Sequence, residues 1–291
     1  MKLVLNKSIA AVVILATTAI LSNNVAAAKN VEATKGQVVK QQSVLKQAHI
    51  KFSKDKVYEI AYVSIIPGKE SQVFNDYFPK ALPIAARYGG KSVGMLAVPG
   101  VKDGTRQAQM AAIFEWPSVE SWLQLHKDQD FLKVVPIRDD AIAFGNPANF
   151  YTVNKDIEAT FTEGKMYELA NYTLKQDDDG WSSKKSIFDK FIKQEKSSAL
   201  NNGSKQDIVF TPVPLSTYMK KTIDLTCGHH NGYGSDDLGL VPHMTRLREW
   251  ANFESYDNHL RSISVKKANK AKNSAVKHEL TLKTVFGFPQ G

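Results

Sequence analysis

Cysteine is nearly absent from this sequence, which has a single one, Cys227, among 291 residues. One thiol cannot close an intrachain disulfide, so packing must stabilise the chain even in an oxidising compartment. The sequence also lacks a Walker loop, a G-x-S-x-G elbow, an H-E-x-x-H pair and a dinucleotide fingerprint. These absences argue against the common hydrolases and the nucleotide-dependent enzymes.

Long apolar runs are missing beyond the N-terminus. At the N-terminus, Lys2 and Lys7 precede an apolar run over residues 9–21. Residues 26–28 are three alanines, which suit cleavage by a signal peptidase. The run is shorter than the roughly 20 apolar residues of a membrane-spanning helix. We therefore expect residues 1–28 to be a signal peptide cleaved near Ala28, a periplasmic or secreted location, and no transmembrane segment after cleavage.

Acidic residues are fewer than basic ones, with 29 Asp and Glu against 38 Lys and Arg. The densest basic cluster consists of Lys266, Lys267, Lys270, Lys272 and Lys277. Such a cluster can attract anionic lipid, polysaccharide or an acidic ligand, although a solvated helix face is the simpler interpretation and the one we prefer. No nucleic-acid-binding motif accompanies the charge, so we expect no nucleic-acid partner.

Two short segments recur in the same order along the chain. KVYEIA at residues 56–61 recurs as KMYELA at 165–170, and EWPSVESW at 115–122 recurs as EWANFESY at 249–256. The first segment is typical of a strand. In the second, a strand ends at the tryptophan and a Ser or Asn follows where a helix N-cap belongs. The shared order indicates an internal duplication.

The duplication divides the chain into repeats of about 100 to 130 residues. We expect one repeat over 56–155 and another over 165–291, preceded by a linker or tether over 29–55. The first repeat is predicted to run strand, helix, strand, strand, helix pair, strand, which is the βαββαβ order of a ferredoxin-like unit. The elements expected in it are a strand at 57–65, a helix ending at residues 88–90, strands at 91–98 and 107–116, helices over 118–142 and a strand at 149–153.

Three of these segments carry a family resemblance. They are YGG at 88–90, FEWPS at 114–118 and IRDDA at 137–141, which contains Arg138. Together they resemble the small dimeric α+β barrel family known as domain of unknown function 1330. The resemblance implies an α+β fold in which two ferredoxin-like βαββαβ repeats pack as an internal pseudo-dimeric barrel around a central cavity. Relatives include cofactor-free monooxygenases, haem-binding enzymes, isomerases and proteins without known activity, so the fold does not decide the function.

An insertion over residues 226–243 concentrates chemically active side chains. They are Cys227, His229, His230, Asp236, Asp237 and His243. Thiolate, imidazole and carboxylate suit a divalent metal, although the spacing fits no standard zinc signature. A metal site in this loop is therefore one hypothesis, and a polar loop without metal is the alternative. In a metal-free enzyme, His229, His230 or His243 would serve as the catalytic base.

These patterns lead to two hypotheses about function. The first is an exported small-molecule-binding barrel with the 226–243 loop at the inter-repeat cavity, whose catalytic status stays open. The second is a non-catalytic periplasmic accessory or partner-binding protein, and homo-oligomers fit either. Tyr58 and Tyr167 head the first strands and face either the cavity or the core, while Arg138 contacts a ligand, caps a helix or pairs with an acid. We expect His126 on the core side of its helix and His259 exposed.

Overall fold

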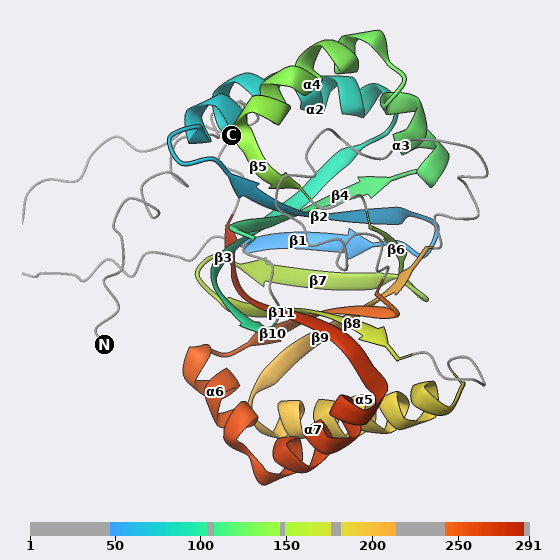
Figure 1. Ribbon diagram of the computed structural model, residues 1–291, viewed down its shortest axis with the longest axis vertical. Coiled ribbons are helices and arrows are strands. Elements are labelled where there is room, and N and C mark those ends of the chain that lie inside the picture. Colours follow the sequence, from blue (N-terminus) through green and yellow to red (C-terminus); the bar gives the residue numbers. More distant parts are fainter. Residues whose placement is uncertain (1–46, 104–107, 146–148, 176–181, 214–241, 288–291) are drawn as a thin grey trace, which may run out of the picture.

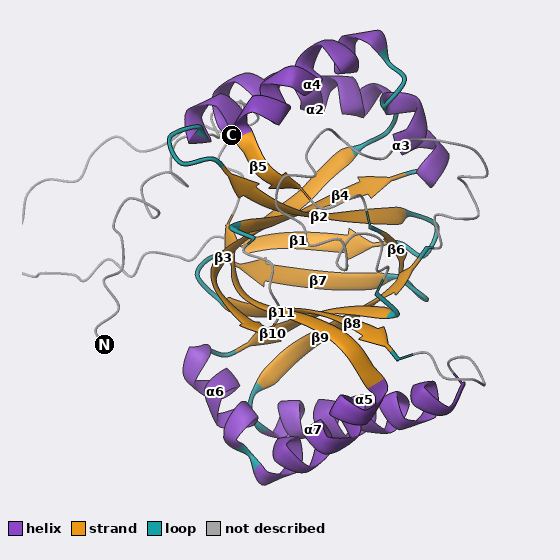
Figure 2. Ribbon diagram, in the orientation of Figure 1, coloured by secondary structure: helices purple, strands orange, loops and turns teal. Residues whose placement is uncertain are grey.

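The computed structural model describes residues 47–103, 108–145, 149–175, 182–213 and 242–287. In this part of the chain the fold is mixed α+β, with a closed eight-strand barrel and six α-helices (Figures 1 and 2). None of the helices described is long and apolar enough to cross a membrane. The expected signal peptide lies outside the described residues.

Strands and helices alternate in what we call the N-terminal half. Its elements are β2 (Val57–Ile65), the π-helix η1 (Gln72–Tyr77), α2 (Phe78–Arg87), β3 (Lys91–Asp103), β4 (Met110–Trp116), α3 (Val119–Leu125), α4 (Gln129–Ala141), β5 (Ile142–Gly145) and β6 (Phe150–Thr152). The strands and helices predicted for this region are confirmed. The short strand β5 was not predicted, because it follows α4 directly without a turn signal.

The C-terminal half repeats the alternation. Its elements are β8 (Met166–Leu174), α5 (Ser182–Asn201), β9 (Ser204–Pro212), β10 (Met244–Trp250), α6 (Phe253–Arg261), α7 (Ile263–Ala275) and β11 (Val276–Gly287). The predicted N-caps are confirmed in both halves: Ser118 Oγ accepts from the Ser121 N–H at 3.3 Å, and Asn252 Oδ1 accepts from the Ser255 N–H at 2.8 Å.

The two halves share one barrel. The strand order is β4-β3-β11-β8-β10-β9-β6-β2, and pairing of β2 with β4 closes the ring, while β5 adds to β2 outside it. The halves meet at two antiparallel junctions, β3 with β11 and β6 with β9. The helices of each half cover opposite ends of the molecule, so each half has a sheet face that meets its own helix layer (Figure 1).

Inside the barrel, side chains from both halves form one core that includes Tyr58, Ile60, Tyr167 and Leu247. A separate ribbon of β1 (Gln47–Phe52) and β7 (Ile157–Thr162) packs against this core through apolar side chains. The structure therefore differs from the linker expected over 29–55 at its C-terminal end. Residues 47–52 form a strand because they pair with β7 and because their last side chain, a phenylalanine, is fully buried among aromatic rings.

Candidate functional site

Each half contains the same acid–tryptophan pair between its sheet and its helices. The Trp116 Nε1–H donates to Glu59 Oε2 at 3.1 Å, and the Trp250 Nε1–H donates to Glu168 Oε2 at 3.2 Å. Both indole rings are buried. The glutamates and tryptophans stand at matching positions of the recurring segments, so the correspondence between these segments extends to their hydrogen-bond partners.

The surroundings of Glu59 are aromatic. In the strand register Glu59 lies opposite Phe114 of β4 and Phe150 of β6. Trp122 of α3 contacts the Phe150 ring edge-on at 5.1 Å, and its indole favours the ionised form of Glu59. We call these five residues, Glu59, Phe114, Trp116, Trp122 and Phe150, the Glu59 site.

Glu59 binds its proton more tightly than an ordinary glutamate does. Burial raises the pKa of Glu59 to about 7, although the Trp116 and Trp122 hydrogen bonds and the Arg138 charge all favour the ionised form. The cause is desolvation, because the flanking side chains are apolar rings rather than cations. A carboxyl with this pKa both accepts and donates a proton near neutral pH.

The helix-facing side of β2 is less completely buried than its barrel side. Along β2 the side chains that point into the barrel, Tyr58, Ile60 and Tyr62, are buried, whereas Val57, Glu59, Ala61 and Val63 on the helix-facing side are partly exposed. Along β8, in contrast, every residue from Met166 to Leu174 is buried. The helix-facing side of the sheet is therefore less tightly covered along β2 than along β8.

The glycine motif of the family resemblance holds Trp116 in place. Gly89 adopts a positive φ of 76°, and a Cβ atom there would lie 2.5 Å from the Pro117 ring. A Cβ atom at Gly90 would lie 2.4 Å from the Trp116 ring. The YGG and FEWPS segments therefore pack directly on one another, and only glycine leaves room for the indole that donates to Glu59.

His126 and Arg138 lie at the edge of the Glu59 site. The His126 ring stacks on Trp122, with centroids 3.7 Å apart, and its Nδ1 lies 3.0 Å from the Trp122 carbonyl oxygen, which assigns the proton to Nδ1. Burial lowers the pKa of His126 to about 4, with a smaller contribution from the Arg138 charge. Arg138 itself pairs with Asp139 at 2.8 Å. His126 is thus a neutral packed ring at physiological pH.

The matching region of the C-terminal half is filled by buried charges. Arg246 and Arg248 of β10 are fully buried and pair with Glu195 of α5 at 2.6 and 2.5 Å. Burial alone would raise the pKa of Glu195, but Arg246, His259 and Arg248 hold it well below its usual range. The expectation that His259 is exposed is wrong: the ring is 1% exposed, because its Nε2 meets Glu195 at 3.1 Å.

The tyrosines predicted to face the cavity or the core lie in the core. Tyr58 accepts a hydrogen bond from the Ser53 N–H at 2.6 Å, and Tyr167 accepts one from the Thr162 N–H at 2.8 Å. Each hydroxyl thus fixes the end of β1 or β7. Burial raises the pKa of Tyr58 above its usual range and that of Tyr167 to about 12, so both stay protonated. Their contacts are those of packing residues.

Of the residues predicted for the loop site, the structure describes only His243. Cys227, His229, His230, Asp236 and Asp237 lie outside the described residues, so their role as metal ligands stays a prediction. His243 continues the pairing of β10 with β8: its N–H donates to the Tyr172 carbonyl at 2.7 Å and its Nδ1 accepts from the Leu174 N–H at 3.1 Å. Burial lowers its pKa. The described residues contain no cluster of three metal-ligating side chains.

The sequence contained a signal for the Glu59 site that motif searching missed. The glutamate and the tryptophan recur in both repeats, but Phe114 in one copy corresponds to Arg248 in the other. That difference decides whether the glutamate has an arginine opposite it on the neighbouring strand. A position-by-position comparison of the two segments would have singled out Glu59 as the acid without one.

Comparisons with known proteins agree with the resemblance. None of the curated proteins matches the chain. Similar solved structures include an anthrone oxidase-like protein (TM-score 0.48, 11% identity, 81% of this chain and 94% of that chain), a variant of chlorite dismutase from Candidatus Nitrospira defluvii (0.45, 10%, 79% and 91%) and a haem-binding protein from Thermus thermophilus (0.39, 7%, 82% and 93%). At these TM-scores the likeness carries no argument about function. Residues 56–145 match the family model described as domain of unknown function (DUF1330), which confirms the resemblance that the motifs of the first repeat predicted.

Proposed function

We propose that this protein binds a small molecule at the Glu59 site, between the helices and the sheet of the N-terminal half. The observation that carries the proposal is a glutamate on a partly exposed side of β2 whose carboxyl has a pKa of about 7 among aromatic rings. The partly exposed ring of Phe114 offers a stacking surface, and a carboxyl that titrates near neutral pH can accept a proton from a weakly acidic group. The ligand class is therefore a planar, apolar molecule with one hydroxyl or similar donor.

The proposal can be tested with a panel of such compounds and two variants. Glu59→Gln removes the titrating group, and Glu120→Gln changes an exposed glutamate on α3 as the matched control. We expect at least one hydroxylated aromatic compound to raise the melting temperature of the wild type and of the Glu120 variant, and not of the Glu59 variant. If no compound raises the wild-type melting temperature, the non-catalytic partner-binding alternative becomes the better explanation.

We propose further that the two halves are copies of one ferredoxin-like unit packed as an internal pseudo-dimer. The acid–tryptophan pairs, the two N-caps and the two core tyrosines support this, because each pair occupies matching positions and makes matching contacts. The inter-repeat interior holds aromatic side chains such as Phe52, Phe161 and Phe210 in close contact. We therefore place the ligand outside the barrel.

Two predictions from the sequence remain part of the proposal. Export should leave a chain that begins near Lys29, which N-terminal sequencing of the periplasmic protein checks. A metal in the 226–243 loop should appear in elemental analysis of protein purified without chelators and should be lost in the His229→Ala, His230→Ala double variant. Metal that persists in the double variant at the wild-type level would exclude these ligands.

A further inference from the structure

The helices of the two halves differ in charge. Helices α5 and α7 together carry nine lysines and two acids, whereas η1, α2, α3 and α4 carry four basic and five acidic residues. In the sequence only the α7 lysines formed a visible cluster. The structure packs α5 against α7, which places the lysines of both helices in one layer (Figure 1).

The lysines lie on the outer side of this layer. Phe188, Phe191 and Glu195 mark the buried face of α5, and Val265 and Ala268 mark that of α7. The exposed lysines are Lys185, Lys190, Lys193 and Lys196 on α5 and Lys266, Lys267 and Lys270 on α7. We call these seven residues the lysine face. Among the described side chains of the two helices Asp189 is the only exposed acid, and it pairs with Lys185 at 2.6 Å.

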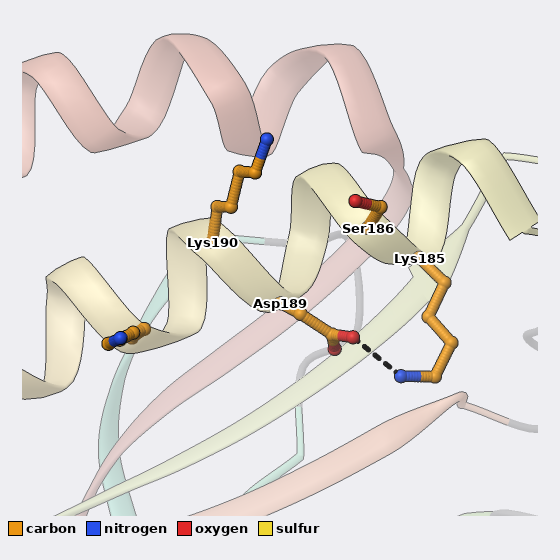
Figure 3. Close-up of a pocket in the computed structure, with 5 residues that line it drawn as sticks. Lys185, Ser186, Asp189 and Lys190 are labelled. Atoms are coloured by element: carbon orange, nitrogen blue, oxygen red, sulfur yellow. Dashed lines mark hydrogen bonds and ion pairs between the residues drawn. The ribbon is translucent and has the colours of Figure 1, made fainter.

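An exposed leucine belongs to the same surface. Leu200 is 55% exposed and follows Lys196 by four positions and Lys193 by seven, so the three side chains share one stripe of α5. Basic residues next to an exposed apolar side chain are typical of helices that lie in a membrane interface. A shallow surface hollow beside them is lined by Lys185, Ser186, Asp189, Lys190 and Lys193 (Figure 3).

We propose that the lysine face binds the surface of an anionic phospholipid bilayer. The two helices pack side by side, and α5 is about 30 Å long, so their lysines are spread over an area that suits a plane of headgroups. Each lysine near an anionic surface contributes attraction, and Leu200 adds apolar contact that a nucleic acid or a soluble polyanion would not use. The proposal is independent of the ligand at the Glu59 site.

Vesicle co-sedimentation of the full chain tests the proposal. We expect binding to vesicles of phosphatidylcholine with about a third phosphatidylglycerol, no binding to phosphatidylcholine alone, and a loss of binding as salt is raised. Replacing Lys190, Lys193, Lys266 and Lys270 by glutamine should weaken binding by about 100-fold or more. Leu200→Ser keeps the charge and should weaken binding by roughly fivefold.

A matched variant separates the lysine face from net charge. It replaces Lys80, Lys91, Lys127 and Lys133, which are exposed in the N-terminal half, by glutamine. This variant should bind like the wild type, and every variant keeps the same N-terminus, so any contribution of residues 1–46 cancels. Equal losses in the two quadruple variants would overturn the proposal, as would binding to a DNA duplex without binding to the anionic vesicles.

Discussion

Each half places a glutamate next to a tryptophan at matching positions, but the other neighbours of the two glutamates differ. Glu168 lies opposite Arg248 on one side and Lys283 on the other, and the arginines also contact Glu195 and Asp207. Glu59 lies opposite Phe114 and Phe150. The Glu168 carboxylate lies 3.7 and 3.9 Å from two buried arginines, whereas the strand neighbours of Glu59 are aromatic rings and the residue is less completely buried.

The difference shows how one framework can hold a structural site and a reactive one. Arg246 and Arg248 give the buried Glu168 carboxylate ion-pair partners. Aromatic neighbours leave the desolvation uncompensated, and the pKa rises. We therefore regard the C-terminal network as the part that holds its helices to the sheet and the Glu59 site as the part that is available for chemistry.

The largest expected effect comes from breaking the C-terminal network. Glu195→Gln removes the acid shared by Arg246, Arg248 and His259 and leaves two guanidinium groups buried with weaker partners. The free energy of unfolding should fall by about 3–5 kcal/mol. Urea unfolding at pH 7 measures it. Asp189→Asn breaks an exposed ion pair on the same helix and should cost less than about 1 kcal/mol; equal costs would contradict a structural role for the network.

A second, smaller effect is expected where the glycine motif meets Trp116. Gly90→Ala places a methyl group against the indole ring and should destabilise the protein by about 1–3 kcal/mol, because a packed ring has to move. Thermal unfolding measures the loss, with Ser92→Ala at an exposed position of β3 as the control. The displaced indole should also change the pKa of Glu59, which carboxyl NMR detects. An unchanged pKa would mean that Trp116 does not set it.

The pH dependence of stability should report the titration of Glu59. Since the pKa of Glu59 is raised from 4.5 to about 7, the native state binds the proton more tightly than the unfolded chain. Stability should therefore fall as pH rises from about 4.5 to about 7, by roughly 2 kcal/mol once partial exposure is allowed for. Glu59→Gln should remove this fall. His126, whose lowered pKa acts with the opposite sign, is present in both proteins and cancels in the comparison.

Much of the fold was visible in the sequence because its signals are local. The strand at 57–65, the caps at Ser118 and Asn252 and the glycine stop each depend on a few neighbouring residues. The strand β1 was missed because its apolar contacts come from β7, more than 100 residues later. Its own sequence, QAHIKF, has little to mark it as buried.

The candidate sites were harder to predict for the same reason. In β10 the sequence MTRLREW has four polar or charged residues among seven, which does not mark the segment as a buried strand. Arg246 and Arg248 are nevertheless buried, because both pair with Glu195 of α5, which lies about 50 positions earlier in the sequence. The contrast between Glu59 and Glu168 likewise depends on strand partners that no local pattern reveals.

The smallest expected effect lies where the halves are the same. Ser118 and Asn252 both cap the helix that follows the tryptophan strand, each accepting from the backbone N–H three residues on. Ser118→Ala and Asn252→Ala should each cost about 1 kcal/mol in the free energy of unfolding, and the exchanges Ser118→Asn and Asn252→Ser should be nearly neutral. Chemical denaturation of the four variants checks this. If both alanine variants lose the same free energy of unfolding and both exchanges are tolerated, the two halves differ mainly in the residues around Glu59 and Glu168. If the two losses differ, the halves differ already in the caps of their matching helices.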